Sequence, residues 1–162
     1  MQLPLISELS KELKTLITAF VIVLSVGFYS GIRFVNETDS HTASGVYENY
    51  LGNEENENAE VFKFKKTNRE MISIVHSHII SMALIFLSIG GLLSMVPLGK
   101  KLKYFITIEP FVSIILTFGG IYLMWMGIEW MRYIVIVSGI LMTLCYTAAV
   151  VLILKHTLVK SK

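Results

Sequence analysis

The 162-residue chain is 54% hydrophobic and only 16% charged, with a formal net charge of +2 and one cysteine. Soluble globular domains average about 25% charged residues, so this composition indicates a membrane protein. A lone cysteine excludes an intrachain disulfide, a cysteine-based metal site and a thiol oxidoreductase. The small net charge gives no sign of a nucleic-acid partner.

Four apolar segments are each long enough to cross a bilayer as a helix, which takes about 20 residues. Their continuous hydrophobicity excludes barrel strands, which alternate. The segments are Leu13 to Ile32, Ile72 to Val96, Tyr104 to Met126 and Tyr133 to Leu154. We therefore predict an all-α, polytopic membrane protein in which residues 1–162 form one transmembrane four-helix bundle surrounded by membrane lipids.

Two flanking regions leave alternatives open. Between Leu3 and Leu13, apolar and polar residues interleave, which predicts either a short helix in the membrane interface or an extension of the first span. The long loop from Arg33 to Arg69 becomes acidic and then basic. Apolar and charged residues alternate from Val61 to Lys65, which predicts either a short strand or a solvated connector. The acidic residues of this loop are Glu54, Glu55, Glu57 and Glu60.

Basic residues in short flanking segments predict the orientation, because such residues remain on the cytoplasmic side. The turn Pro97 to Lys103 holds three lysines, and further lysines precede the first span and follow the fourth. We expect both termini in the cytoplasm and the loop Arg33 to Arg69 outside, in a bacterial inner membrane.

Small and aromatic residues predict how the spans pack. Serines recur every fourth residue at Ser73, Ser77 and Ser81, a spacing that lets helices approach closely. The third and fourth spans are joined by a few residues, so we expect them to form an antiparallel hairpin. Aromatic residues gather at that connection as an interfacial belt. They are Tyr122, Trp125, Trp130 and Tyr133.

His76 and His78 are the first candidate site. Successive helical residues differ by about 100°, so these two imidazoles point to roughly opposite faces and cannot both bind one ion. Either one could bind haem iron or a metal ion alone. The second ligand would be His41 from the outer loop or the same histidine of another subunit, and an acid such as Glu48 could complete a metal site. The alternative is a structural role at the interface.

The run Val75 to Met82, which contains both histidines, resembles the His-x-His helix of the catalytic subunit of haem-copper oxidases. It also resembles small, uncharacterised bacterial membrane proteins related to that subunit. The resemblance implies haem b held by His76 or His78 as axial ligand. It does not extend to oxygen reduction, since no span has the histidines of a copper site and the pair Ser81 and Met82 is one residue too close to the histidines.

Glu109 is the second candidate site. It lies about two turns inside the cytoplasmic end of the third span and precedes Pro110. A carboxylate at this depth costs a few kcal/mol unless it is protonated, paired or hydrated. We expect either a tether between helices, to Lys101, Lys103 or a partner, or a step in a proton or cation pathway.

The sequence contains no phosphate-binding loop and no arrangement of nucleophile and base, so we expect no autonomous enzyme. It favours a small noncatalytic accessory or assembly subunit of a larger bacterial-type membrane complex, in contact with other membrane subunits or with copies of itself. One alternative is a haem-binding membrane electron carrier that uses His76 or His78. The other is an ion or small-solute conductor that uses Glu109.

Overall fold

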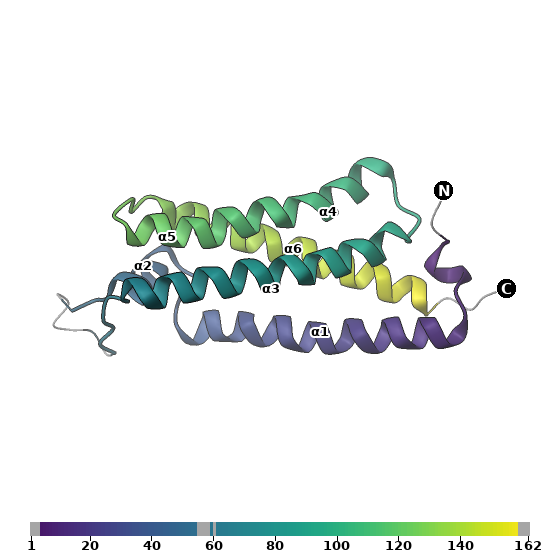
Figure 1. Ribbon diagram of the computed structural model, residues 1–162, viewed down its shortest axis with the longest axis horizontal. Coiled ribbons are helices and arrows are strands. Elements are labelled where there is room, and N and C mark those ends of the chain that lie inside the picture. Colours follow the sequence, from purple (N-terminus) through teal and green to yellow (C-terminus); the bar gives the residue numbers. More distant parts are fainter. Residues whose placement is uncertain (1–3, 55–58, 60, 159–162) are drawn as a thin grey trace.

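A computed structural model describes residues 4–54, 59 and 61–158, and this part of the chain is an all-helical bundle (Figure 1). The fold class predicted from sequence is confirmed, with four helical stretches long and apolar enough to cross a membrane. The third of them is a composite, because α4 passes through a π-helical segment, Ile115–Gly119, directly into α5. The helices are α1 (Lys11–Glu37), α2 (Ala43–Leu51), α3 (Asn68–Ser94), α4 (Lys100–Ile114), α5 (Gly120–Trp125) and α6 (Met131–Thr157).

The long helices extend beyond the apolar runs because polar residues cap them. Ser10 accepts a hydrogen bond from the amide of Leu13 and starts α1. Thr67 and Glu70 form a capping box, in which the Thr67 amide donates to Oε2 of Glu70 at 2.7 Å, so α3 begins at Asn68. The starts of these two helices therefore lie in polar sequence outside the apolar runs.

Helix α6 is the centre of the bundle, since it contacts α1, α2, α3, α4 and α5. Its Tyr146 is fully buried and stacks on Phe28 of α1 with ring centroids 3.8 Å apart. Phe86 of α3 meets the same ring edge-on at 5.9 Å. The Tyr146 hydroxyl lies 3.2 Å from Oγ of Ser25, so one side chain of α6 joins α1 and α3.

The four membrane-spanning stretches are packed to different extents. In the most apolar 18-residue window of each, 44% of the residues are buried in α4–α5 and 39% in α6, but only 11% in α1 and 11% in α3. The α4–α5/α6 hairpin thus forms the compact half of the bundle. Most of the surface of α1 and α3 faces outward.

The segment before α1 forms a separate short helical turn and is not an extension of the first span. Ile6–Glu8 is a single 3₁₀ turn, separated from α1 by the Ser10 cap. The Ile6 amide donates to the carbonyl of Met95 at 3.0 Å, and the Ile6 side chain is fully buried. This turn therefore covers the end of α3; Leu3 lies outside the described residues.

The loop between α1 and α3 folds back on itself instead of forming the strand alternative. Helix α2 is followed by Gly52, where φ is +86° and a Cβ atom would lie 2.9 Å from the Lys63 carbonyl oxygen, so the position suits only glycine. The Asn53 amide donates to that carbonyl at 2.9 Å, and the Lys66 amide donates to the Tyr50 carbonyl. No strand forms in the described part of this loop. Glu55, Glu57 and Glu60 lie outside that part.

Candidate functional site

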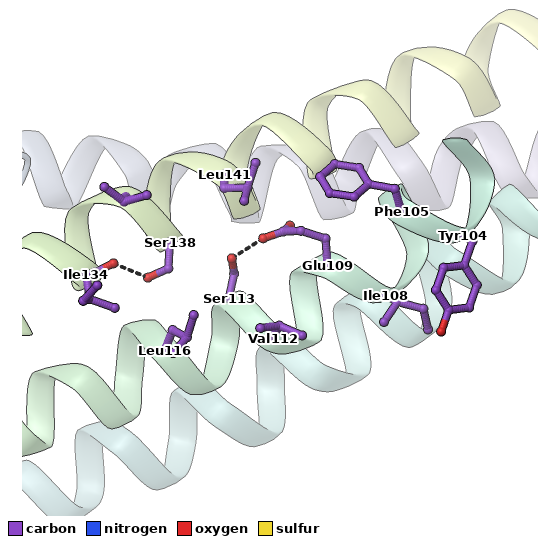
Figure 2. Close-up of a pocket in the computed structure, with 11 residues that line it drawn as sticks. Tyr104, Phe105, Ile108, Glu109, Val112, Ser113, Leu116, Ile134, Ser138 and Leu141 are labelled. Carbon is purple, nitrogen blue, oxygen red and sulfur yellow. Dashed lines mark hydrogen bonds between the residues drawn. The ribbon is translucent and has the colours of Figure 1, made fainter. Parts of the chain in front are cut away.

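Glu109 lies at the inner wall of a groove between α4 and α6 (Figure 2). Oε1 of Glu109 accepts a hydrogen bond from the Ser113 hydroxyl one turn further along α4. Oε2 is buried and has no hydrogen-bond partner among the described residues. We call this space, about 420 Å³ in volume, the Glu109 groove. It is lined by Tyr104, Phe105, Ile108, Glu109, Val112, Ser113, Leu116, Ile134, Val137, Ser138 and Leu141.

The lysine tethers expected for Glu109 do not form within the described part of the chain. Nζ of Lys103 donates to the Ser94 carbonyl at 3.0 Å, and this bond joins the start of α4 to the end of α3. Lys101 is exposed and makes no ion pair with Glu109 there. The polar group that faces the carboxyl from α6 is the buried Cys145 thiol, a weak hydrogen-bond donor.

A second polar pair lies further along the same helix interface. Oγ1 of Thr117, in the π-helical segment, is 2.7 Å from Oγ of Ser138 on α6, and both residues are buried. No hydrogen bond links this pair to Glu109 and Ser113 within the described residues. The π-helix was not predicted from sequence; it lies just after Pro110 and ends at the Gly119–Gly120 pair.

The three histidines considered as ligands lie on the outside of the molecule. His76 and His78 are exposed on α3, and His41 is exposed in the turn between α1 and α2. Nδ1 of His78 lies 2.8 Å from the Ile74 carbonyl, and its ring packs 4.8 Å from the ring of Phe118. In the part of the chain that the structure describes, no group of three or more His, Cys, Asp or Glu residues could hold a metal ion.

Aromatic residues at the loop end hold the outer segment against the bundle. Nε1 of Trp125 donates to the Lys66 carbonyl at 2.8 Å, and Nζ of Lys65 lies 5.4 Å from the Trp125 ring. The Arg132 guanidinium lies over the rings of Tyr47 and Tyr133. Trp125, one of the expected belt residues, therefore binds the loop.

Burial raises the pKa of the Tyr50 phenol in the same cluster, since it disfavours the phenolate.

Two outward faces of the bundle carry small residues at four-residue spacing. Gly27 and Gly31 are exposed on α1, and a Cβ atom at either position would meet nothing within 4 Å. Ser73, Ser77 and Ser81 are exposed on α3. The Ser77 and Ser81 hydroxyls donate to carbonyls of their own helix. The glycine spacing on α1 was not among the sequence predictions, although it can be read from the sequence alone.

Comparison with known proteins agrees with this architecture. A family model described as a transmembrane helical domain matches residues 40–162, more than half of the chain. No curated protein and no solved structure matches the chain. With four apolar spans and this match, the chain is an integral membrane protein and belongs to the Aq_1264_TM family of transmembrane helical domains.

Proposed function

We propose that the protein is a noncatalytic accessory or assembly subunit of a larger bacterial-type membrane complex. The observation that carries this proposal is the pair of outward small-residue faces, Gly27 and Gly31 on α1 and Ser73, Ser77 and Ser81 on α3. Both faces belong to the helices whose surface is least buried within the chain.

The physical argument concerns what drives helix association in lipid. Lipid tails are as apolar as leucine, so helices associate through close backbone packing and hydrogen bonds rather than through hydrophobic burial. Small residues at four-residue spacing permit that close packing. On α1 and α3 these residues are exposed in the described bundle, which favours contact with helices of other subunits.

Bulky substitutions on α1 test this proposal. The variant with both Gly27→Ile and Gly31→Ile should lose its partner subunits, because the side chains would prevent close approach of another helix. Native mass spectrometry of the complex extracted from its own membrane in mild detergent measures the change. The control is Val26→Ile, at a position 69% exposed on the same helix, which should keep the complex.

Two outcomes would count against the accessory role. In one, the doubly substituted protein retains the mass and composition of the native complex. In the other, the native protein extracted in mild detergent is a monomer. Thermal unfolding of each variant, measured by helical circular dichroism, shows whether the fold is intact.

The same proposal places both termini in the cytoplasm of a bacterium and the protein in its inner membrane. Support comes from Lys100, Lys101 and Lys103 at the start of α4 and from the described ends of the chain, Pro4 and Leu158, which lie at one end of the bundle (Figure 1). Maleimide labelling of Ser40→Cys and Lys101→Cys in intact cells tests the orientation. Ser40→Cys should be labelled from outside; labelling of Lys101→Cys alone would invert the assignment.

Haem ligation by His78 is a second candidate function, favoured by one contact. When Nδ1 donates to the Ile74 carbonyl, Nε2 is left as the nitrogen able to bind iron, which is the usual arrangement of a metal-bound histidine. His156 makes the same type of contact with the Leu152 carbonyl at the other end of the bundle. This histidine is therefore a matched control.

An absorption spectrum of the purified protein tests haem binding. If His78 is the ligand, a Soret band should be present and should be lost in His78→Ala but kept in His156→Ala. The same measurement on His76→Ala distinguishes the two histidines of α3. A colourless protein, or a band unchanged in all three variants, would remove this candidate.

A further inference from the structure

We propose that the segment from Val61 to Lys66, which we call the Phe-Lys segment, is a membrane-interface anchor. The rings of Phe62 and Phe64 enter the boundary between the lipid headgroups and the acyl chains. This proposal is independent of the accessory role, because the segment lies in the loop between α2 and α3 and the small-residue faces lie within α1 and α3.

The large apolar side chains of this segment are exposed. Phe62 is 57% exposed, Phe64 is 72% exposed and Val61 is 66% exposed. None of the three belongs to the buried core. Exposed apolar side chains that gather in one place mark a surface that contacts a partner or a membrane.

The backbone of the segment is bonded to the end of α2. Oδ1 of Asn53 accepts a hydrogen bond from the Lys63 amide at 2.7 Å, and Nδ2 of Asn53 donates to the Val61 carbonyl at 3.0 Å. The Lys66 amide donates to the Tyr50 carbonyl at 3.1 Å. These bonds hold the segment at both ends, so the two rings project from an ordered support.

The lysines that alternate with the phenylalanines contact the bundle. Nζ of Lys63 donates to the Thr38 carbonyl at 3.0 Å, and Nζ of Lys65 lies 5.4 Å from the Trp125 ring. In water the opposite arrangement is favoured, with lysines directed to the solvent and phenylalanines against the protein. The observed arrangement therefore indicates that the outer side of the segment meets apolar surroundings.

The depth of the segment in the membrane follows from α3. This helix begins at Asn68, and its apolar run begins four residues later at Ile72, about 6 Å further along the axis at 1.5 Å per residue. The headgroup layer on each side of a bilayer is about 5–8 Å thick. The segment therefore joins α3 at the level of the headgroups, and a phenylalanine ring there reaches the acyl chains.

The contacts of α2 place the segment at the edge of this end of the bundle. Helix α2 contacts α5 and α6, so it covers the middle of the end. The Phe-Lys segment is bonded beside α2 and leads into α3, one of the two helices whose surface is least buried (Figure 1). Arg69 is exposed in the first turn of α3 and adds a positive charge at the level of the lipid phosphates.

Photocrosslinking from position 64 tests this assignment on the full-length protein. p-Benzoylphenylalanine replaces Phe64, the protein is placed in vesicles of phosphatidylethanolamine and phosphatidylglycerol, and ultraviolet light joins the ring to neighbouring C–H groups. Mass spectrometry should find a phospholipid adduct. The same replacement at Val26, exposed in the apolar part of α1, should also give one. At His41, exposed in the turn between α1 and α2, it should give far less.

A second measurement does not depend on crosslinking. Phe64→Cys and His41→Cys, each combined with Cys145→Ala so that no other thiol reacts, carry a nitroxide spin label in the same vesicles. Oxygen concentrates in lipid and a nickel chelate stays in water. The label at position 64 should therefore collide more often with oxygen, and the label at position 41 more often with the chelate. Circular dichroism compares the helix content of each variant with that of the native protein.

Three results would overturn the proposal. The first is an equal yield of lipid adducts from positions 64 and 41, and the second is a label at position 64 that collides more often with the nickel chelate. The third is a crosslink in the native membrane that joins position 64 to a second polypeptide instead of lipid. This last result would assign the Phe-Lys segment to a protein partner.

Discussion

The α4–α5/α6 hairpin and the pair α1 and α3 are held in the bundle by different means. In the hairpin, close backbone approach and a buried hydroxyl pair act along the interface, as at Gly120 and at Thr117 with Ser138. Helix α1 is attached mainly around one aromatic cluster, in which Tyr146 contacts Phe28, whereas α3 meets Tyr146 through Phe86 and also packs along α4.

This difference in how the helices are attached follows from the lipid around them. In water, the exposed leucines and valines of α1 and α3 would drive these helices together, but in lipid they gain nothing from burial. A helix can therefore remain bound through a few specific contacts and present most of its surface to the bilayer or to partners. This is the physical basis for the proposal that α1 and α3 contact other subunits.

The largest effect should come from removing the aromatic cluster. Tyr146→Ala should lower the free energy of unfolding by about 3 kcal/mol, because it leaves a cavity where α1, α3 and α6 meet. Unfolding of the protein in mixed micelles by titration with sodium dodecyl sulfate measures this change.

Tyr146→Phe is the matched control, since it keeps the ring and loses only the contact between the hydroxyl and Ser25. Its cost should be about 0.6 kcal/mol, the average for hydrogen bonds between membrane helices. Equal effects of the two substitutions would show that the ring stack does not hold α1 and α3 in place.

Two neighbouring glycines probe the close packing of the hairpin. A Cβ atom at Gly120 would lie 3.0 Å from Cγ2 of Val135 and 3.2 Å from Cε of Met131, whereas one at Gly119 would meet nothing within 4 Å. Gly120→Ala should therefore cost about 1 kcal/mol through overpacking. Gly119→Ala should be neutral or stabilising, because alanine favours helix. The same unfolding titration compares them, and a larger loss at Gly119 would contradict the close approach at Gly120.

The sequence predicted the helical class and the four spans because hydrophobic length is a direct consequence of bilayer thickness. It did not predict the helix ends. Hydropathy stops at Ile32, whereas α1 continues to Glu37, where Arg33 and Glu37 form an ion pair at 3.5 Å. Polar residues beyond the apolar run, rather than the run itself, decide where this helix stops.

The sequence identified the residues of the candidate sites, but it did not predict which groups their side chains contact. Glu109 was identified from its rarity in an apolar span, yet its bond to Ser113 depends on the helical register and its groove depends on how α6 packs. The exposure of His76 and His78 depends on how α3 is rotated, which hydropathy does not fix. The π-helical segment Ile115–Gly119 interrupts the regular period between α4 and α5, and hydropathy does not reveal it.

The smallest expected effect concerns the hydroxyl pair in that segment. Thr117→Val and Ser138→Ala each remove one side of the 2.7 Å contact, and a double-mutant cycle isolates the coupling between them. We expect about 0.6 kcal/mol in the unfolding titration, because hydroxyls in membrane helices find other acceptors when a partner is lost. Ser138 already has one in the Ile134 carbonyl at 2.7 Å. A coupling above about 2 kcal/mol would exceed the range known for such pairs and would mean that the hairpin depends strongly on this one contact.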